Sequence, residues 1–328
     1  MTLRVVMTRT LAAGAAAAFM VLAAPIHALA QSYPSRPVRV IVPFPGGNVT
    51  DTWVRAIMER AQTALGQPII VEPKPGAGAM IGAQYALAQP ADGYTMLMYT
   101  SSHAIRSAGP NPPFDVRKDL VPVVRNFGGA FFLAVNAEKV PAKTLAEFIS
   151  YARANPGKLN FSSYGPNTLG HLGSLLFAKE ANIQVVHVPY NGSSANVLAL
   201  ASGDSHVAFD VLQALTPHVQ SGKVRILAVG NAERFELAPQ YPGMKESGFG
   251  LEITAINGTT AKAGTPREAI VKFNAAVNAA IREPKLVEYF SKVGQKLYGG
   301  TPEELGRLIN AEYKTFDQVI REYNIKFD

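Results

Sequence analysis

Apolar and polar residues alternate along the chain in a way that predicts a repeated strand–turn–helix pattern. Residues 38–42 are β-branched and nearly uninterrupted, as in a strand buried inside a parallel sheet, and a helical pattern follows at about residues 52–65. A strand at residues 68–72, a helix at 79–89 and an apolar strand at 95–99 complete the first group. The pattern indicates an α/β protein.

The same pattern recurs after residue 120. Strands are expected at residues 120–124, 131–135, 159–162, 185–188, 207–209 and 224–229. Helices are expected at residues 144–155 and 168–182, from 194, from about 213, and at 266–282, 284–293 and 302–323. The last apolar strand is a candidate return to the first group. We therefore expect two lobes with crossovers near residues 125 and 225: lobe 1 at 31–125 plus 226–328, and lobe 2 at 126–225.

The segment at residues 43–51 joins the first strand to the first helix. Its two prolines end the strand because neither has an N–H to donate, and Gly46 and Gly47 allow a tight turn. Thr50 or Asp51 is expected to cap the helix. Free N–H groups and the helix dipole would make this turn an anion site, although an ordinary βα turn explains it equally well.

Polar segments follow several of the predicted strands. In open α/β sheets, ligands bind at the carboxyl ends of the strands. Residues 45–48, 76–78 and the polar loop expected at 100–103 should therefore converge. A second glycine-containing turn, at residues 163–167, precedes the helix expected from Thr168 and repeats the arrangement of the first site.

The first thirty residues have the pattern of a secretory signal peptide. Arg4 and Arg9 precede an alanine-rich apolar stretch at residues 11–24, and Ala28-Leu29-Ala30 matches a cleavage site. The apolar stretch is shorter than the roughly twenty residues that a membrane span needs. We expect residues 1–30 to be removed and the mature protein to be periplasmic; an uncleaved anchor is the alternative.

Charge and cysteine content narrow the function classes. Loss of residues 1–30 would remove two arginines and no acidic residue, so the formal charge would fall from +7 to +5. The remaining basic residues are scattered, and nucleic-acid binding is not expected. The chain has no cysteine, which excludes disulfides, iron–sulfur clusters and thiolate metal sites.

Signatures of catalysis are scarce. The sequence contains neither a G-x-x-x-x-G-K-[ST] phosphate loop nor a G-x-S-x-G elbow. Ser163 and His171 could meet as nucleophile and base, but no acid that would orient the histidine accompanies them, and a packing or capping role is favoured. We therefore predict no enzyme activity, no metal and no cofactor.

Several short motifs occur in the order typical of one known family. They are Val42-Pro-Phe-Pro-Gly-Gly47 with Asp51 and Arg55, Pro75-Gly-Ala-Gly78, Asp92-Gly-Tyr-Thr95, Asn155-Pro-Gly-Lys158, Ser163-x-Gly165-x-x-Thr168-x-x-His171, His187-Val-Pro-Tyr190 and Gly264-Thr-Pro266. With these motifs the mature chain resembles the Bug or TctC-like solute-binding proteins of tripartite tricarboxylate transporters. The resemblance implies an α/β, two-lobed periplasmic-binding-protein fold, type II-like, with a ligand cleft between lobes joined by a hinge.

The resemblance also implies that a monomer captures an organic carboxylate (a diacid, a triacid or an aromatic acid) and delivers it to permease subunits in the inner membrane. A carboxylate-sensing partner of a membrane signalling protein, or a hydrolase, is the alternative. Carried over by position and combined with the polar strand ends, the expected ligand-binding residues are Phe44, Gly46, Gly47, Asn48, Asp51, Gly76, Ala77, Gly78, Ser101, Ser102, Ser163, Thr168, Tyr190 and Asp210.

Overall fold

The computed structural model describes residues 33–325, and the expected signal peptide lies outside them. The described strands form two sheets. The first contains, in spatial order, β11 (Lys296–Gly299), β4 (Leu120–Gly128), β10 (Asn257–Lys262), β3 (Thr95–Thr100), β1 (Val38–Val42) and β2 (Ile69–Pro73). The second contains β7 (Val185–Pro189), β6 (Leu159–Ser163), β8 (Val207–Val211), β5 (Phe131–Asn136) and β9 (Val224–Val229). Each sheet with its helices is called a lobe below.

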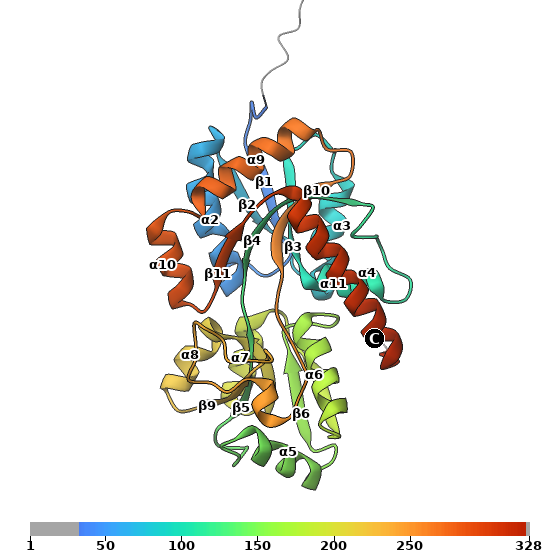
Figure 1. Cartoon of the computed structure of the whole chain (residues 1–328), viewed down its shortest axis with the longest axis vertical. Helices are drawn as coiled ribbons and strands as arrows, with labels where there is room; N and C mark the ends of the chain where they lie inside the picture. Colours follow the sequence, from blue (N-terminus) through green and yellow to red (C-terminus); the bar gives the residue numbers. More distant parts are fainter. Residues whose placement is uncertain (1–32, 326–328) are drawn as a thin grey trace, which may run out of the picture. The chain divides into compact units, whose positions relative to one another are not determined.

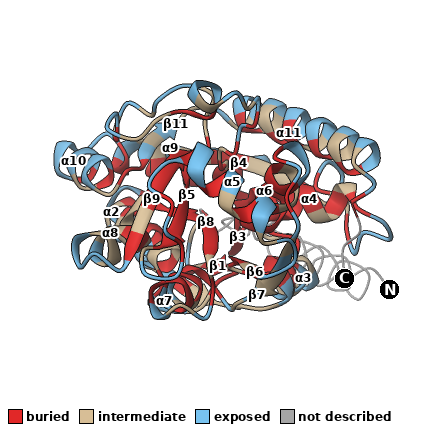
Figure 2. Ribbon diagram, turned by 90° about the horizontal axis from the view of Figure 1, so that it is seen from below, coloured by how far each residue is buried: buried red, intermediate tan, exposed pale blue. Residues whose placement is uncertain are grey.

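Helices cover both sheets (Figure 1). Those of the first lobe are α2 (Val49–Leu65), α3 (Met80–Ala88), α4 (Ser101–Ala108), α9 (Arg267–Ala280), α10 (Pro284–Lys292) and α11 (Pro302–Glu322). Those of the second are α5 (Leu145–Ala154), α6 (Leu169–Glu180), α7 (Ser193–Ser202) and α8 (Leu212–Gln220). Short 3₁₀ turns lie at η1 (Ala77–Ala79) and η2 (Met244–Ser247). Figure 2 shows mainly buried strands and exposed outer faces on α10 and α11.

Parallel pairing aligns the strand ends in each lobe. β1 lies between β2 and β3 and is parallel to both, while β6 lies between β7 and β8 and is parallel to both. All residues of β3, β5 and β8 are buried, as expected for strands covered on both faces. The carboxyl ends of β1, β2 and β3 therefore meet at one edge of the first sheet, and those of β6, β7 and β8 meet at one edge of the second, as the sequence predicts.

The return to the first lobe comes later than predicted. β9, at residues 224–229, pairs antiparallel with β5 in the second sheet, with Val229 opposite Phe132, so its assignment to lobe 1 is wrong. The first crossover follows β4, which extends to Gly128. The second crossover runs beside it: the Ala255 N–H donates to the Gly129 carbonyl at 3.3 Å, and Ala130 pairs with Thr254.

Two strands were not predicted, and one of them is central. β10 lies between β3 and β4 and carries a polar sequence, Asn-Gly-Thr-Thr-Ala-Lys. Its buried hydroxyls have partners: Thr259 bonds with the side chain of Asn126, and the Thr260 hydroxyl donates to the Leu97 carbonyl at 3.3 Å. Because these partners come from distant segments, hydropathy alone does not identify the strand.

Candidate functional site

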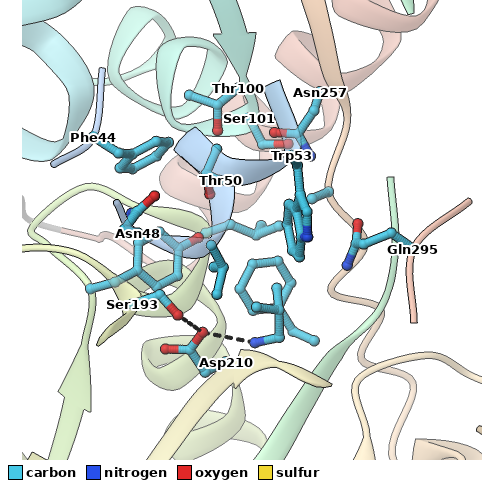
Figure 3. Close-up of a pocket in the computed structure, with 17 residues that line it drawn as sticks. Phe44, Asn48, Thr50, Trp53, Thr100, Ser101, Ser193, Asp210, Asn257 and Gln295 are labelled. Carbon is cyan, nitrogen blue, oxygen red and sulfur yellow. Dashed lines mark hydrogen bonds between the residues drawn. The ribbon is translucent and has the colours of Figure 1, made fainter. Parts of the chain in front are cut away.

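A cavity of about 530 Å³, its open mouth included, lies between the two lobes (Figure 3). Its lining residues are Phe44, Asn48, Val49, Thr50, Trp53, Thr100, Ser101, Gly129, Phe131, Tyr164, Leu169, Ser193, Asp210, Val211, Ala255, Asn257 and Gln295. Among these described residues there is no lysine, arginine or histidine, and Asp210 is the one carboxylate. An anion in this cavity would therefore have to be held by neutral donors and helix starts.

Five helices begin at this cavity. Val49, Ser101, Leu169 and Ser193 are the first residues of α2, α4, α6 and α7, and Val211 immediately precedes α8. The first N–H groups of a helix have no partner within it, and the helix dipole places partial positive charge there. Both lobes thus present N-terminal helix ends to the same space, an arrangement suited to anions.

The turn before α2 is held by its own side chains. Asn48, rather than Thr50 or Asp51, caps the helix: its Oδ1 accepts from the Asp51 N–H at 2.9 Å, and the helix begins three residues earlier than predicted. Oδ2 of Asp51 accepts from the Gly47 N–H at 2.9 Å and from Nε of Arg55 at 2.9 Å. Because the Gly47 N–H is already engaged, it is not free for a ligand, and the amide nitrogen of Asn48 is a donor that this turn can offer.

Ser101 is also hydrogen-bonded to residues that do not line this cavity. The expected loop at residues 100–103 is instead the start of α4. The Ser101 hydroxyl donates to Oε1 of Glu312 at 2.5 Å and accepts from the Ile256 N–H at 3.0 Å, while the Tyr99 hydroxyl donates to Oε2 of Glu312 at 2.7 Å. Burial raises the pKa of Glu312 to about 7, against the lowering effect of these two donors. With Glu312 ionised, Ser101 offers the cavity a lone pair rather than a proton.

Asp210 forms the second-lobe wall of the cavity. It is the penultimate residue of β8, is fully buried, and accepts from the Ser193 hydroxyl, from Nδ2 of Asn196 at 2.7 Å and from the Val211 N–H at 2.8 Å. The Ser193 hydroxyl, whose bond is drawn in Figure 3, and the Val211 N–H both donate to Oδ1 of Asp210. Burial raises the pKa of Asp210 to about 6, although the three donors favour the ionised form. Asp210 thus lines the cavity while its oxygens are hydrogen-bonded to donors of its own lobe.

The hydroxyls of Ser163 and Thr168, which were predicted to contact the ligand from the second-lobe turn, do not line this cavity. Ser163 donates to the Gly165 carbonyl at 2.9 Å, and Thr168 donates to the same carbonyl at 2.7 Å. Both residues are fully buried. His171 does not pair with Ser163; Nε2 of His187 lies 2.8 Å from the Ser163 Oγ. Because Ser163 is fully buried and its Oγ also accepts from the Gly165 N–H at 3.3 Å, it is not exposed for attack on a ligand.

A second cavity, of about 680 Å³ with its mouth, adjoins the first. Phe44 and Tyr164 line both, with ring centroids 6.3 Å apart in an edge-to-face contact. The remaining lining residues are Pro43, Gly76, Ala77, Gly78, Ala79, Gly165, Pro166, Pro189, Tyr190 and Asn191. The four residues 76–79 all have positive φ, which places a left-handed turn of lobe 1 against lobe 2.

Residues 53–325 match the model of the tripartite tricarboxylate transporter family receptor, TctC. The chain belongs to this family. It is 34% identical to a Pseudomonas protein encoded in a tcbD–tcbE intergenic region, over 90% of this chain and 88% of the relative. It is 33% identical to Protein BugT of Bordetella pertussis, over 98% of this chain and 99% of BugT.

Solved structures agree with this assignment. A periplasmic transporter structure is 35% identical, with a TM-score of 0.85 over 90% of this chain and all of the other. R. palustris Rpa4515 with adipate is 30% identical, with a TM-score of 0.84 over 89% of this chain and 99% of Rpa4515. MatC from Rhodopseudomonas palustris with bound malate is 28% identical, with a TM-score of 0.83 over 88% of this chain and all of MatC. The predicted family, two-lobed fold and non-enzymatic role of this TctC receptor are confirmed.

The predicted site residues of the receptor fall into three groups. Phe44, Asn48, Ser101 and Asp210 line the first cavity, and Phe44, Gly76, Ala77, Gly78 and Tyr190 line the second. Gly46, Gly47, Asp51, Ser102, Ser163 and Thr168 line neither of these cavities. The last group shapes the turns and helix starts instead. A ligand-binding role for the first two groups stays a prediction.

Several lining residues of the TctC receptor were missed by sequence reasoning. Trp53, Tyr164 and Ser193 line the first cavity, as do Asn257 and Gln295. Trp53 was in principle detectable, because it follows Val49, the first residue of α2, by one helical turn on the same face. Gln295 gives no local signal, since the fold alone brings it to the cavity. In the described part of the receptor, no helix has the length and apolar character needed to cross a membrane.

Proposed function

We propose that this receptor captures an organic carboxylate in the first interlobe cavity and delivers it to a tripartite permease in the inner membrane. The observation that carries the proposal is the convergence of five helix N-termini on a cavity whose lining contains no basic side chain. The adipate and malate in the two R. palustris structures support a carboxylate as the ligand class.

Neutral donors are sufficient for useful affinity. A helix N-terminus contributes about 0.3–2 kcal/mol toward an anion. A hydrogen bond to a charged group contributes about 1.5–3 kcal/mol net. Two helix starts and two such bonds together reach the roughly 8 kcal/mol of a micromolar complex, before the cost of ordering the ligand. An arginine clamp is therefore not required.

The proposal includes the setting in which the receptor works. The mature chain starts near residue 31, acts as a periplasmic monomer and closes its lobes around the ligand. The paired crossovers at residues 128–131 and 253–257 serve as the hinge. Lobe 1 then comprises residues 33–128 and 257–325, and lobe 2 comprises residues 129–256.

Calorimetry with the mature chain tests this function. The panel contains aliphatic and aromatic carboxylates, each paired with its primary amide as a neutral control of the same shape. We expect micromolar binding of at least one acid, no binding of its amide, and no product formed from it. Binding of amides as tightly as acids, or of no acid at all, would contradict the proposal.

A further inference from the structure

Trp53 is the one tryptophan of the chain, and it forms part of the cavity wall. Its side chain is 2% exposed and packs edge-on against Phe127, with ring centroids 5.3 Å apart. Phe127 in turn contacts Phe290 at 5.7 Å. This cluster of rings fixes the indole to lobe 1, so the wall that it forms does not depend on a flexible side chain.

The same indole is bonded to the other lobe. Its Nε1–H donates to Oε1 of Gln213 at 2.5 Å, between residues 160 positions apart in the sequence. Gln213 is the second residue of α8, directly after the cavity residue Val211 and its neighbour Leu212. The hydrogen bond therefore spans the cleft beside the cavity. In Figure 3, Trp53 and Phe44 lie on opposite sides of the space, with Thr50 between them.

We propose that Trp53 is a specificity-determining residue that sets the length of ligand the cavity accepts, with Gln213 holding the indole in place across the cleft. The inference rests on the proposed function. A ligand that extends past the indole would have to displace a ring packed on Phe127 and break the bond to Gln213. Replacing the indole by a small side chain would open space toward α8. Loss of the N–H alone would leave an aromatic ring in the cavity wall, so the length of the cavity would not change.

Three variants separate these two roles. Trp53→Ala removes ring and donor, Trp53→Phe keeps a ring and removes the donor, and Gln213→Ala removes the acceptor. Gln89→Ala is the matched control, because this glutamine also accepts a side-chain hydrogen bond, from Arg39 at 3.1 Å, and lines neither cavity. Thermal unfolding of each variant shows that it is folded.

Calorimetric titrations use straight-chain mono- and dicarboxylates of four to eight carbons. We expect Trp53→Ala to move the tightest-binding chain length upward by at least one methylene. Trp53→Phe and Gln213→Ala should keep the wild-type optimum and lose about threefold to tenfold in affinity, the usual worth of one hydrogen bond. Gln89→Ala should bind as the wild type does.

Two results would overturn the inference alone. One is a folded Trp53→Ala with an unchanged optimum. The other is tryptophan emission of the wild type that does not change at saturating ligand, which is decisive even if Trp53→Ala fails to fold. Wild-type protein that binds no member of the series would refute the proposed function together with this inference.

Discussion

Gly78 offers the most direct test of whether ligand binding requires the close approach of the two lobes at this residue. It belongs to the left-handed turn of lobe 1, with φ +60, and a Cβ built on it would lie 2.0 Å from the Pro166 carbonyl oxygen of lobe 2. Real Cβ atoms essentially never lie within 3.0 Å of a heavy atom from elsewhere in the chain, so Gly78→Ala requires the two backbones to separate by about 1 Å or more. The atom in the way is the backbone oxygen of Pro166, which cannot move aside by a side-chain rotation.

The magnitude follows from two contributions. Left-handed φ costs an alanine about 1–2 kcal/mol wherever it occurs. Overpacking adds about 1–3 kcal/mol, but only in the conformation in which the lobes touch. The first cost falls on stability and the second on closure, so binding should weaken by about fivefold to 150-fold.

Gly157→Ala is the control for backbone strain, because Gly157 has φ +71 and nothing within 4 Å of a built Cβ. Without ligand, both variants should lose similar thermal stability. Only Gly78→Ala should also lose affinity in calorimetry and keep a larger radius of gyration than the wild type in small-angle scattering at saturating ligand. If Gly78→Ala binds as tightly as Gly157→Ala, the approach of the two turns is not part of binding.

Three further predictions concern the helix starts. Burial raises the pKa of Glu312 to about 7, so this carboxyl contributes stability at low pH, and the contribution is lost as the pH rises through 7. The melting temperature of the wild type should therefore rise relative to that of Glu312→Gln as the pH falls from about 8 to about 5. A difference between the two melting temperatures that does not depend on pH would contradict this. Thr168→Ala should lower stability by about 0.5–2 kcal/mol, since it caps α6, and leave affinity within threefold by calorimetry; a tenfold loss would restore it as a ligand contact. Asn48→Asp should keep the α2 cap but weaken carboxylate binding at least tenfold, because it adds a negative charge to the wall, whereas equal affinity would place the anion elsewhere.

The sequence was most informative where one segment determines its own structure. The β-branched run at residues 38–42 and the glycine turn after it form as predicted, because buried strands and tight turns depend on local residues. Residue type alone did not decide which of Asn48, Thr50 and Asp51 caps the helix. All three can cap a helix, and the tie is broken by the Asp51 carboxylate, which bonds to Gly47 and Arg55 instead.

The cavity itself was only partly predictable, because its other walls come from distant segments. Glu312 lies 211 residues from Ser101, yet a signal was present. On α11 the buried residues are Leu305, Ile309, Glu312, Phe316 and Ile320, so an acid interrupts an apolar stripe at helical spacing. A buried acid requires donors, and their identity was available only from the fold.

The paired crossovers have a consequence for how such receptors can be rebuilt. Residues 129–256 form one contiguous insertion whose two ends are hydrogen-bonded neighbours, with the Ala255 N–H on the Gly129 carbonyl at 3.3 Å. A segment with adjacent ends can be exchanged between homologous chains at two short junctions, without rerouting the backbone of the recipient. Exchange of this segment would transfer the second-lobe half of the cavity, with Asp210 and Ser193, as one unit. The recipient chain would supply the first-lobe half, where Trp53 and Asn48 lie in this receptor. Chimaeras cut at these junctions would therefore recombine two half-sites in a single step.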